Sequence, residues 1–154
     1  MDMFKLTPWL NCWNLIPDGT PFVTHTSQLY PVKTATHGIK AMLKVTDDTD
    51  EQTGNALMVW WEGNGAAHVI AHEKEAILLS RATGSASLSA MSRGDKDDIA
   101  CRILCMTANR LHSFAKRPFP RLTSLREWFY PLKPAALQYG GILTRCAEIS
   151  EELL

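Results

Sequence analysis

The sequence carries no excess of charge, because sixteen lysines and arginines balance sixteen aspartates and glutamates. A strongly basic chain attracts nucleic acid or an anionic membrane surface, and this chain has no such field. Long apolar runs are missing too: no stretch approaches the roughly 18 apolar residues that a membrane-spanning helix needs. The N-terminus also lacks a basic leader followed by an apolar run. We therefore expect a cytoplasmic protein with no nucleic-acid partner and no membrane partner.

Cysteine is sparse, and its spacing excludes two kinds of framework. The four cysteines are Cys12, Cys101, Cys105 and Cys146, and none of them forms a CxxC pair. This pattern is typical neither of a zinc site nor of a disulfide-stapled domain, and it favours a reducing cytoplasm.

The first half of the chain reads as short strands, one helix and a hairpin. Pro and Asp-Gly turns separate β-branched and aromatic runs between residues 13 and 45. In the segment 39–45, Ile39 and every second residue after it form an apolar face, so Lys44 points away from that face. Acidic residues 47–51 precede an expected helix over 52–61, which the glycines at 63 and 65 end. Segments 67–71 and 75–81 are expected to form a hairpin whose buried strand is 76–79.

A stretch of small residues at 83–87 marks a change of pattern, and we place a lobe boundary there. Helical spacing begins at Asp97 and is expected to end at His112. Ser124 and Glu127 form a capping box for a short helix that should end near Pro131 and Pro134. A last apolar helical stripe runs from residue 142 to 153.

Lys44 is the first candidate for chemistry. A lysine in the third strand of a kinase-type lobe binds the α- and β-phosphates of ATP when a carboxylate on the next helix holds it. Glu51, at the start of that helix, is the natural partner, although Asp48 and Asp50 are close enough to compete. Taken singly, a strand lysine is usually a solvated residue, and an acidic first turn usually complements the helix dipole.

The turn at Thr24, His25, Thr26 and Ser27 lies between two expected strands, where kinases place a phosphate-covering loop. Its hydroxyls and backbone N–H groups could bind phosphate oxygens. The turn has no GxGxxG motif, so an ordinary polar turn is the alternative. We interpret His112 as a structural helix-end residue, and the tryptophans and methionines as core residues.

Taken together, these segments resemble the aminoglycoside/hydroxyurea antibiotic resistance kinase family, which includes streptomycin 6-phosphotransferases. The resemblance runs from about residue 13 to 154 and rests on the order and spacing of modest phrases. These phrases lie at residues 13–15, 18–21, 24–27, 31–32, 41–44, 54–61, 63–67, 76–82, 97–112, 127–129 and 140–143.

The resemblance implies an α+β fold: a protein-kinase-like N-lobe over residues 1–82, a hinge over 83–88, and the first helices of a C-lobe over 89–154. It implies transfer of the γ-phosphoryl group of ATP, with Mg²⁺, to a hydroxyl of an aminoglycoside antibiotic. Lys44 would bind phosphates, Glu51 would hold Lys44, and Thr26 and Ser27 would cover the phosphates. Arg81 and Ala82 would begin the hinge segment beside adenine.

Two departures from the family pattern matter. Ser80 stands where the family usually has an acidic residue, and no His-Gly-Asp catalytic loop with its following Asn and metal-binding Asp occurs after Gly141. We therefore expect the N-terminal portion of a phosphotransferase, truncated before the catalytic loop and weakly active or inactive alone. The alternatives are an inactive nucleotide-binding or interaction fragment, and a remnant whose helices expose apolar stripes.

Overall fold

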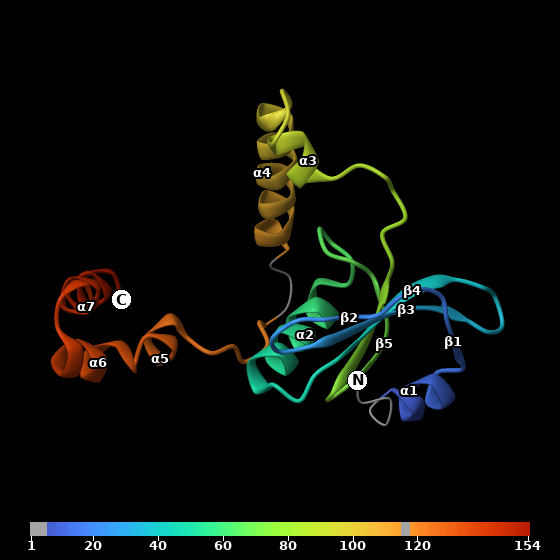
Figure 1. Cartoon of the computed structure of the whole chain (residues 1–154), viewed down its shortest axis with the longest axis horizontal. Coiled ribbons are helices and arrows are strands. Elements are labelled where there is room, and N and C mark those ends of the chain that lie inside the picture. The colour runs from blue at the N-terminus through green and yellow to red at the C-terminus, as the bar shows by residue number, and fades with distance from the viewer. Residues whose placement is uncertain (1–5, 115–117) are drawn as a thin grey trace. The chain divides into compact units, whose positions relative to one another are not determined.

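The computed structural model describes residues 6–114 and 118–154 and divides into two compact units, Met1–Pro120 and Arg121–Leu154 (Figure 1). In the first unit the elements are α1 (Thr7–Cys12), β1 (Leu15–Pro17), β2 (Phe22–Val23), β3 (Gln28–Thr34), β4 (Lys40–Val45), α2 (Thr49–Trp61), β5 (Val69–Glu73), β6 (Ala76–Ser80), α3 (Leu88–Ser92) and α4 (Asp97–Ser113). The second unit holds α5 (Leu125–Trp128), α6 (Leu132–Tyr139) and α7 (Ile142–Leu153).

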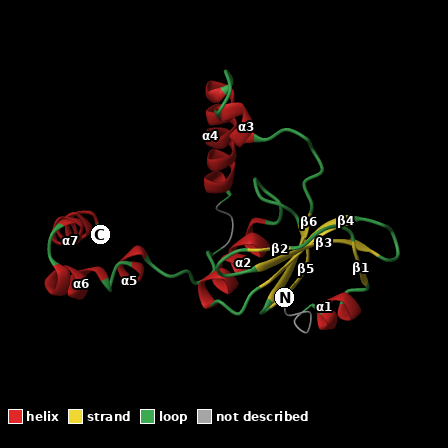
Figure 2. Cartoon of the chain, viewed as in Figure 1, coloured by secondary structure: helices red, strands yellow, loops and turns green. Residues whose placement is uncertain are grey.

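One antiparallel sheet organises the first unit, with strand order β1-β3-β4-β6-β5 (Figure 2). β1 and β2 pair in turn with opposite ends of β3, so they act as one edge strand interrupted by a loop. Gly19 in that loop has φ +150°, and a Cβ there would lie 3.1 Å from the Pro31 ring. A side chain at position 19 would therefore meet both an unfavourable backbone conformation and a crowded contact.

Alternation along β4 divides the sheet into two faces. Ala41, Leu43 and Val45 are buried in the main core with residues of β3 and β6, and Trp9 of α1 packs against this core. Lys44 points to the opposite face, as the sequence pattern predicts, and there it contacts Glu51 of α2. The core thus lies on the α1 side of the sheet, and the lysine lies on the α2 side.

The α+β, kinase-like lobe expected from the sequence is confirmed, with several local corrections. Ile39 precedes β4 and is 51% exposed, so it does not join the core face. Helix α1 was not expected. Pro8 lies in its first turn, where the missing backbone N–H costs little because it would have no intrahelical partner. Helix α2 begins three residues before the expected start because Asp48 caps it.

Beyond the sheet, α4 runs one residue past His112, and the short helix α3 precedes it. Gly65, with φ +81°, lies where a Cβ would be 3.1 Å from the Leu111 side chain, so the loop after α2 closely approaches α4. Along the described ranges, no helix is both long enough and apolar enough to cross a bilayer.

In the second unit the predicted capping box at Ser124 and Glu127 is present, and α7 follows the expected stripe. The capped helix α5 ends at Trp128, shortly before Pro131 as expected, and Pro134 lies in the first turn of the next helix, α6. A proline is tolerated in a first turn, where its absent N–H would have no intrahelical partner.

Candidate phosphate-binding site

An ion pair joins the strand lysine to the helix carboxylate. Lys44 Nζ donates to Glu51 Oε2, and both side chains are largely but not fully shielded from solvent. Of the three carboxylates near the start of α2, it is therefore Glu51 that contacts the lysine. The ion pair holds the Lys44 ammonium group in place on the face of the sheet opposite the main core.

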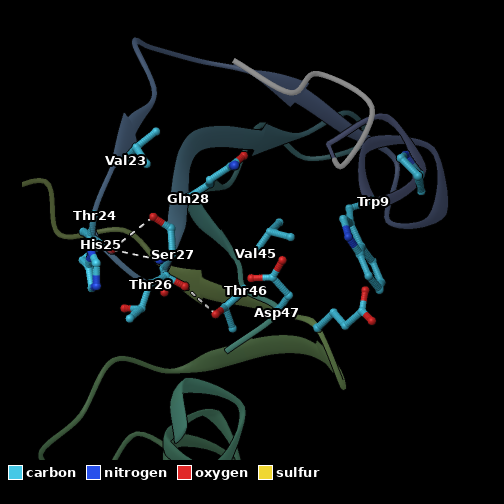
Figure 3. A pocket seen from close by; sticks show the side chains of 12 residues that line it. Trp9, Val23, Thr24, His25, Thr26, Ser27, Gln28, Val45, Thr46 and Asp47 are labelled. Atoms are coloured by element: carbon cyan, nitrogen blue, oxygen red, sulfur yellow. Dashed lines mark hydrogen bonds between the residues drawn. The ribbon is translucent and has the colours of Figure 1, made fainter. Parts of the chain in front are cut away.

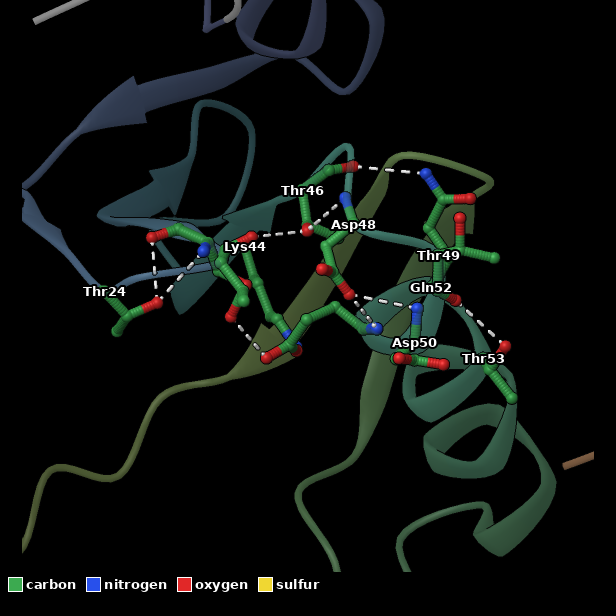
Figure 4. Close-up of polar contacts among 11 residues, drawn as sticks. Thr24, Lys44, Thr46, Asp48, Thr49, Asp50, Gln52 and Thr53 are labelled. Atoms are coloured by element: carbon green, nitrogen blue, oxygen red, sulfur yellow. Dashed lines mark hydrogen bonds and ion pairs between the residues drawn. The ribbon is translucent and has the colours of Figure 1, made fainter. Parts of the chain in front are cut away.

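The start of α2 is held in a way that directs Glu51 toward the strand. Asp48 caps the helix, and its Oδ1 accepts hydrogen bonds from the backbone N–H groups of Asp50 and Glu51, each at 3.0 Å (Figure 4). Thr46, just after β4, accepts from the Asp48 N–H at 3.1 Å. Because these bonds fix the first turn, Glu51 is placed by the backbone and not only by its own rotamer.

The polar turn between β2 and β3 also reaches this carboxylate. Thr26 Oγ1 donates to Glu51 Oε1 at 2.8 Å, so the two carboxylate oxygens have different donors. Thr46 Oγ1 donates to the Thr26 carbonyl at 2.6 Å, and Thr24 Oγ1 accepts from the Ser27 N–H at 3.0 Å. Strand, turn and helix are thereby connected through one small hydrogen-bond network.

The network stabilises the ionised form of Glu51. Hydrogen bonds from Lys44 and then Thr26 hold the pKa of Glu51 below its ordinary value, and partial burial opposes them less strongly. At neutral pH the carboxylate is therefore charged and able to hold the ammonium group in place.

A hollow of about 450 Å³ lies beside the same turn (Figure 3). Trp9 of α1 faces Thr24 and Ser27 across it, and Thr46 and Asp47 form part of its floor. Lys44 and Glu51 are not among its lining residues, and the hollow includes side chains of the core face. Thr26 and Ser27 thus border two environments: this hollow and, through Thr26, the ion pair.

The remaining predicted residues, Arg81 and Ala82, lie apart from that network. Arg81 follows β6, and its guanidinium binds Asp18 in the loop between β1 and β2: Nη2 donates to the carboxylate and Nη1 to the Asp18 carbonyl at 3.1 Å. The hydrogen bond from Arg81 lowers the pKa of Asp18. The Arg81 side chain is therefore occupied by a structural partner sixty-three positions away along the chain.

Sequence reasoning missed two residues that support this region, Thr46 and Asp18. Thr46 is only 4% exposed and bonds both the turn and the helix cap. A threonine directly between a strand and an acidic helix start is a recognisable hint for such a role. Asp18 gave the signal of a turn residue, but nothing in the sequence indicates its distant arginine partner.

No group of three or more histidine, cysteine, aspartate or glutamate side chains gathers into a metal site within residues 6–114 and 118–154. The donors present near Lys44 are engaged with one another, and Glu51 is held by a cation. These residues therefore do not form a binding site for a magnesium ion. The cysteines are unbridged.

The first unit has the arrangement of a protein-kinase-like N-terminal lobe. Its antiparallel sheet carries a strand lysine that pairs with a glutamate on the next helix, and further helices follow. The chain belongs to the aminoglycoside/hydroxyurea antibiotic resistance kinase family, whose sequence pattern matches residues 12–154. The family resemblance drawn from the sequence is therefore confirmed.

A curated relative, streptomycin 3''-kinase of Klebsiella pneumoniae, is 42% identical over 142 residues. The match covers 92% of this chain and 52% of the relative, so the chain spans about half the length of that protein. No solved structure is significantly similar to the chain.

Proposed function

We propose that this chain is the ATP-binding, N-terminal portion of an aminoglycoside O-phosphotransferase that confers resistance to streptomycin-type antibiotics. The observation that carries the proposal is the Lys44–Glu51 ion pair, supported by the Thr26 hydroxyl, in a chain of the resistance kinase family. Because ATP is a cytoplasmic metabolite, we place the activity in the cytoplasm.

In this proposal the residues of the lobe bind and orient the nucleotide. When bound, ATP supplies the γ-phosphoryl group, which passes to an alcohol oxygen of the antibiotic as ADP leaves. Lys44 donates to the α- and β-phosphate oxygens, and Glu51 keeps its ammonium in place. Thr26 and Ser27 belong to the turn that covers the phosphates.

The segment 83–88 remains the proposed hinge beside adenine, with Arg81 and Ala82 at its start. Since the Arg81 guanidinium binds Asp18, the contacts of this segment with adenine would come from backbone groups. The backbone N–H of Arg81 donates to the Lys40 carbonyl at 3.3 Å, so it is not free to bind adenine. The candidates for adenine contacts are therefore the backbone carbonyl groups of this segment and the N–H groups that follow Arg81.

The nucleotide-binding part of the proposal is tested by replacing the lysine. Lys44→Ala should weaken ATP binding at least about tenfold in a calorimetric titration, because a charge-assisted phosphate contact contributes about 1.5–3 kcal/mol. Lys40→Ala is the matched control, since Lys40 lies on the same strand and the same face but is exposed. Equal ATP affinity of the Lys44→Ala variant and the unaltered chain would contradict the proposal.

A catalytically inactive nucleotide-binding fragment is the second candidate. It is favoured by the absence of a His-Gly-Asp loop from these 154 residues, since that loop supplies the carboxylate that orients the attacking hydroxyl. It predicts ATP binding without phosphorylated streptomycin in mass spectra. If product does form, the position of the phosphate distinguishes the 6-hydroxyl from the 3'' position named for the Klebsiella relative.

A further inference from the structure

The hydroxyl of Thr26 binds the carboxylate of the ion pair. Thr26 lies in the turn between β2 and β3, and its Oγ1 donates to Glu51 Oε1 at 2.8 Å. A hydroxyl has a single proton to donate, and the phosphate oxygens of ATP need donors. While that proton lies on Glu51, the Thr26 side chain cannot also donate to a phosphate. The side chain therefore has a task other than covering the phosphates.

The two oxygens of Glu51 have separate donors from separate elements. Lys44 Nζ on β4 bonds Oε2, and Thr26 Oγ1 in the turn bonds Oε1. A glutamate side chain has several staggered rotamers, and a bond to one flexible lysine would restrict them only weakly. With the second donor in place, rotation of the carboxylate breaks one bond or the other. Thr26 thus keeps the carboxylate in the orientation in which Oε2 faces the ammonium group.

The backbone of Thr26 is itself held by a buried residue. Thr46 is 4% exposed, and its hydroxyl donates to the Thr26 carbonyl at 2.6 Å (Figure 3). The same hydroxyl accepts from the backbone N–H of Asp48, the residue that caps α2, at 3.1 Å. Leaving a buried hydroxyl without its partner is costly, so the turn is held at a fixed place relative to the start of the helix. The bond between Thr26 and Glu51 is therefore supported from both sides.

We propose that Thr26 is a positioning residue that acts through Glu51: its hydroxyl orients the carboxylate, which in turn holds Lys44 where the phosphates of ATP bind. The inference rests on the proposed function, and it gives the Thr26 side chain to the ion pair instead of to the nucleotide. Loss of the hydroxyl should then matter only while Glu51 is present. A direct contact of the hydroxyl with a phosphate would matter equally with and without Glu51.

A double-mutant cycle on ATP affinity, measured by calorimetry, separates these two roles. Thr26→Val keeps the branched shape of the side chain and removes the donor. We expect it to weaken ATP binding about fivefold, because a hydrogen bond to a charged group is lost. In the Glu51→Ala background the same change should alter the affinity by less than about twofold. Thr26→Ser keeps the hydroxyl and should restore the affinity of the unaltered chain.

Thr24→Val is the matched control for this cycle. Thr24 lies in the same turn, and its hydroxyl bonds the backbone carbonyl and N–H of Ser27. Its replacement disturbs the turn without removing a donor to Glu51. Any effect of Thr24→Val on ATP affinity should therefore be the same in the chain with Glu51 and in the Glu51→Ala background.

A second cycle, measured without nucleotide, tests the contact itself. Urea unfolding of the unaltered chain, of Thr26→Val, of Glu51→Ala and of the double variant gives the coupling between the two side chains. We expect Thr26→Val to reduce the free energy of unfolding in the chain with Glu51, and to reduce it much less when residue 51 is alanine. Circular dichroism before the titration shows that each variant is folded.

Two affinity results would overturn the inference. One is an equal loss of affinity on Thr26→Val with and without Glu51, and the other is full affinity of Thr26→Val in the chain that keeps Glu51. If Glu51→Ala binds ATP too weakly to measure, the unfolding cycle decides, and additive effects there overturn the inference as well. Failure of the proposed function looks different: the unaltered chain would not bind ATP, or Lys44→Ala would bind it with equal affinity.

Discussion

At the scale of single residues, two ion pairs have different tasks. Lys44 and Glu51 are neighbours across a strand and a helix, and their pair places a cation on a face of the sheet free of the main core. Arg81 and Asp18 tie the end of β6 to the loop after β1. The first arrangement suits phosphate binding, whereas the second fixes the place where the chain leaves the sheet toward the proposed hinge.

The second pair makes a prediction about pH. The pKa of Asp18 is lowered in the folded chain, so its stabilising contribution is present above the unfolded-state pKa of about 3.9 and is lost as the pH falls through the lower folded-state pKa. Asp18→Asn should therefore reduce the free energy of unfolding at pH 7, and the difference from the unaltered chain should shrink below about pH 4. Urea unfolding at pH 7, 4 and 3 measures this difference.

Lys33 provides the comparison for that experiment. Its ammonium lies 3.8 Å from Asp18 but is considerably more exposed than the Arg81 guanidinium, so Lys33→Ala should change the free energy of unfolding little. A constant difference between Asp18→Asn and the unaltered chain at all three pH values would show that the charge of Asp18 is not what stabilises the fold.

At the scale of elements, the start of α2 connects stability with the candidate site. The cap at Asp48 determines where the helix begins and thereby the position of Glu51 one turn later. Thr46 links this cap to the β2–β3 turn through Thr26. A change in the cap should therefore affect both the stability of the lobe and the placement of the carboxylate.

We expect Asp48→Ala to lower the free energy of unfolding by about 1 kcal/mol, the usual cost of losing a side-chain N-cap. Asp48→Ser should restore most of the loss, because a serine hydroxyl also accepts from the N–H groups of the first turn. Denaturant titration monitored by circular dichroism measures both variants. Equal stability of the alanine and serine variants would contradict the capping role.

At the scale of the whole molecule, the two units differ in how much apolar surface they bury. The sheet of the first unit buries a continuous set of side chains from β3, β4 and β6. The second unit has local devices, such as the capping box at Ser124 and the Lys133–Glu151 ion pair, but little buried apolar surface. Capping and exposed ion pairs contribute too little to hold three short helices without a partner.

Amide exchange should show this contrast directly. In the chain alone, backbone amides of α6 and α7 should exchange on the order of a hundredfold faster than those of β3 and β4, because local opening exposes almost no apolar surface. Hydrogen–deuterium exchange with mass spectrometry measures both segments in one sample. Comparable protection of the two segments would mean that the second unit already has a packing partner.

The sequence by itself determined the elements whose signals are local. Alternation in residues 39–45 predicted which way Lys44 points, the acidic run predicted a carboxylate at the start of α2, and Ser124 with Glu127 predicted a capped helix. Such signals persist in the structure because side-chain direction and capping depend on neighbours a few positions away.

Only the tertiary structure decided the rest. It selected Glu51 over Asp48 and Asp50 as the partner of Lys44, paired Arg81 with Asp18, and covered the core with α1. Residues far apart in the sequence meet because strand order and register bring them together, and neither is encoded in a local pattern.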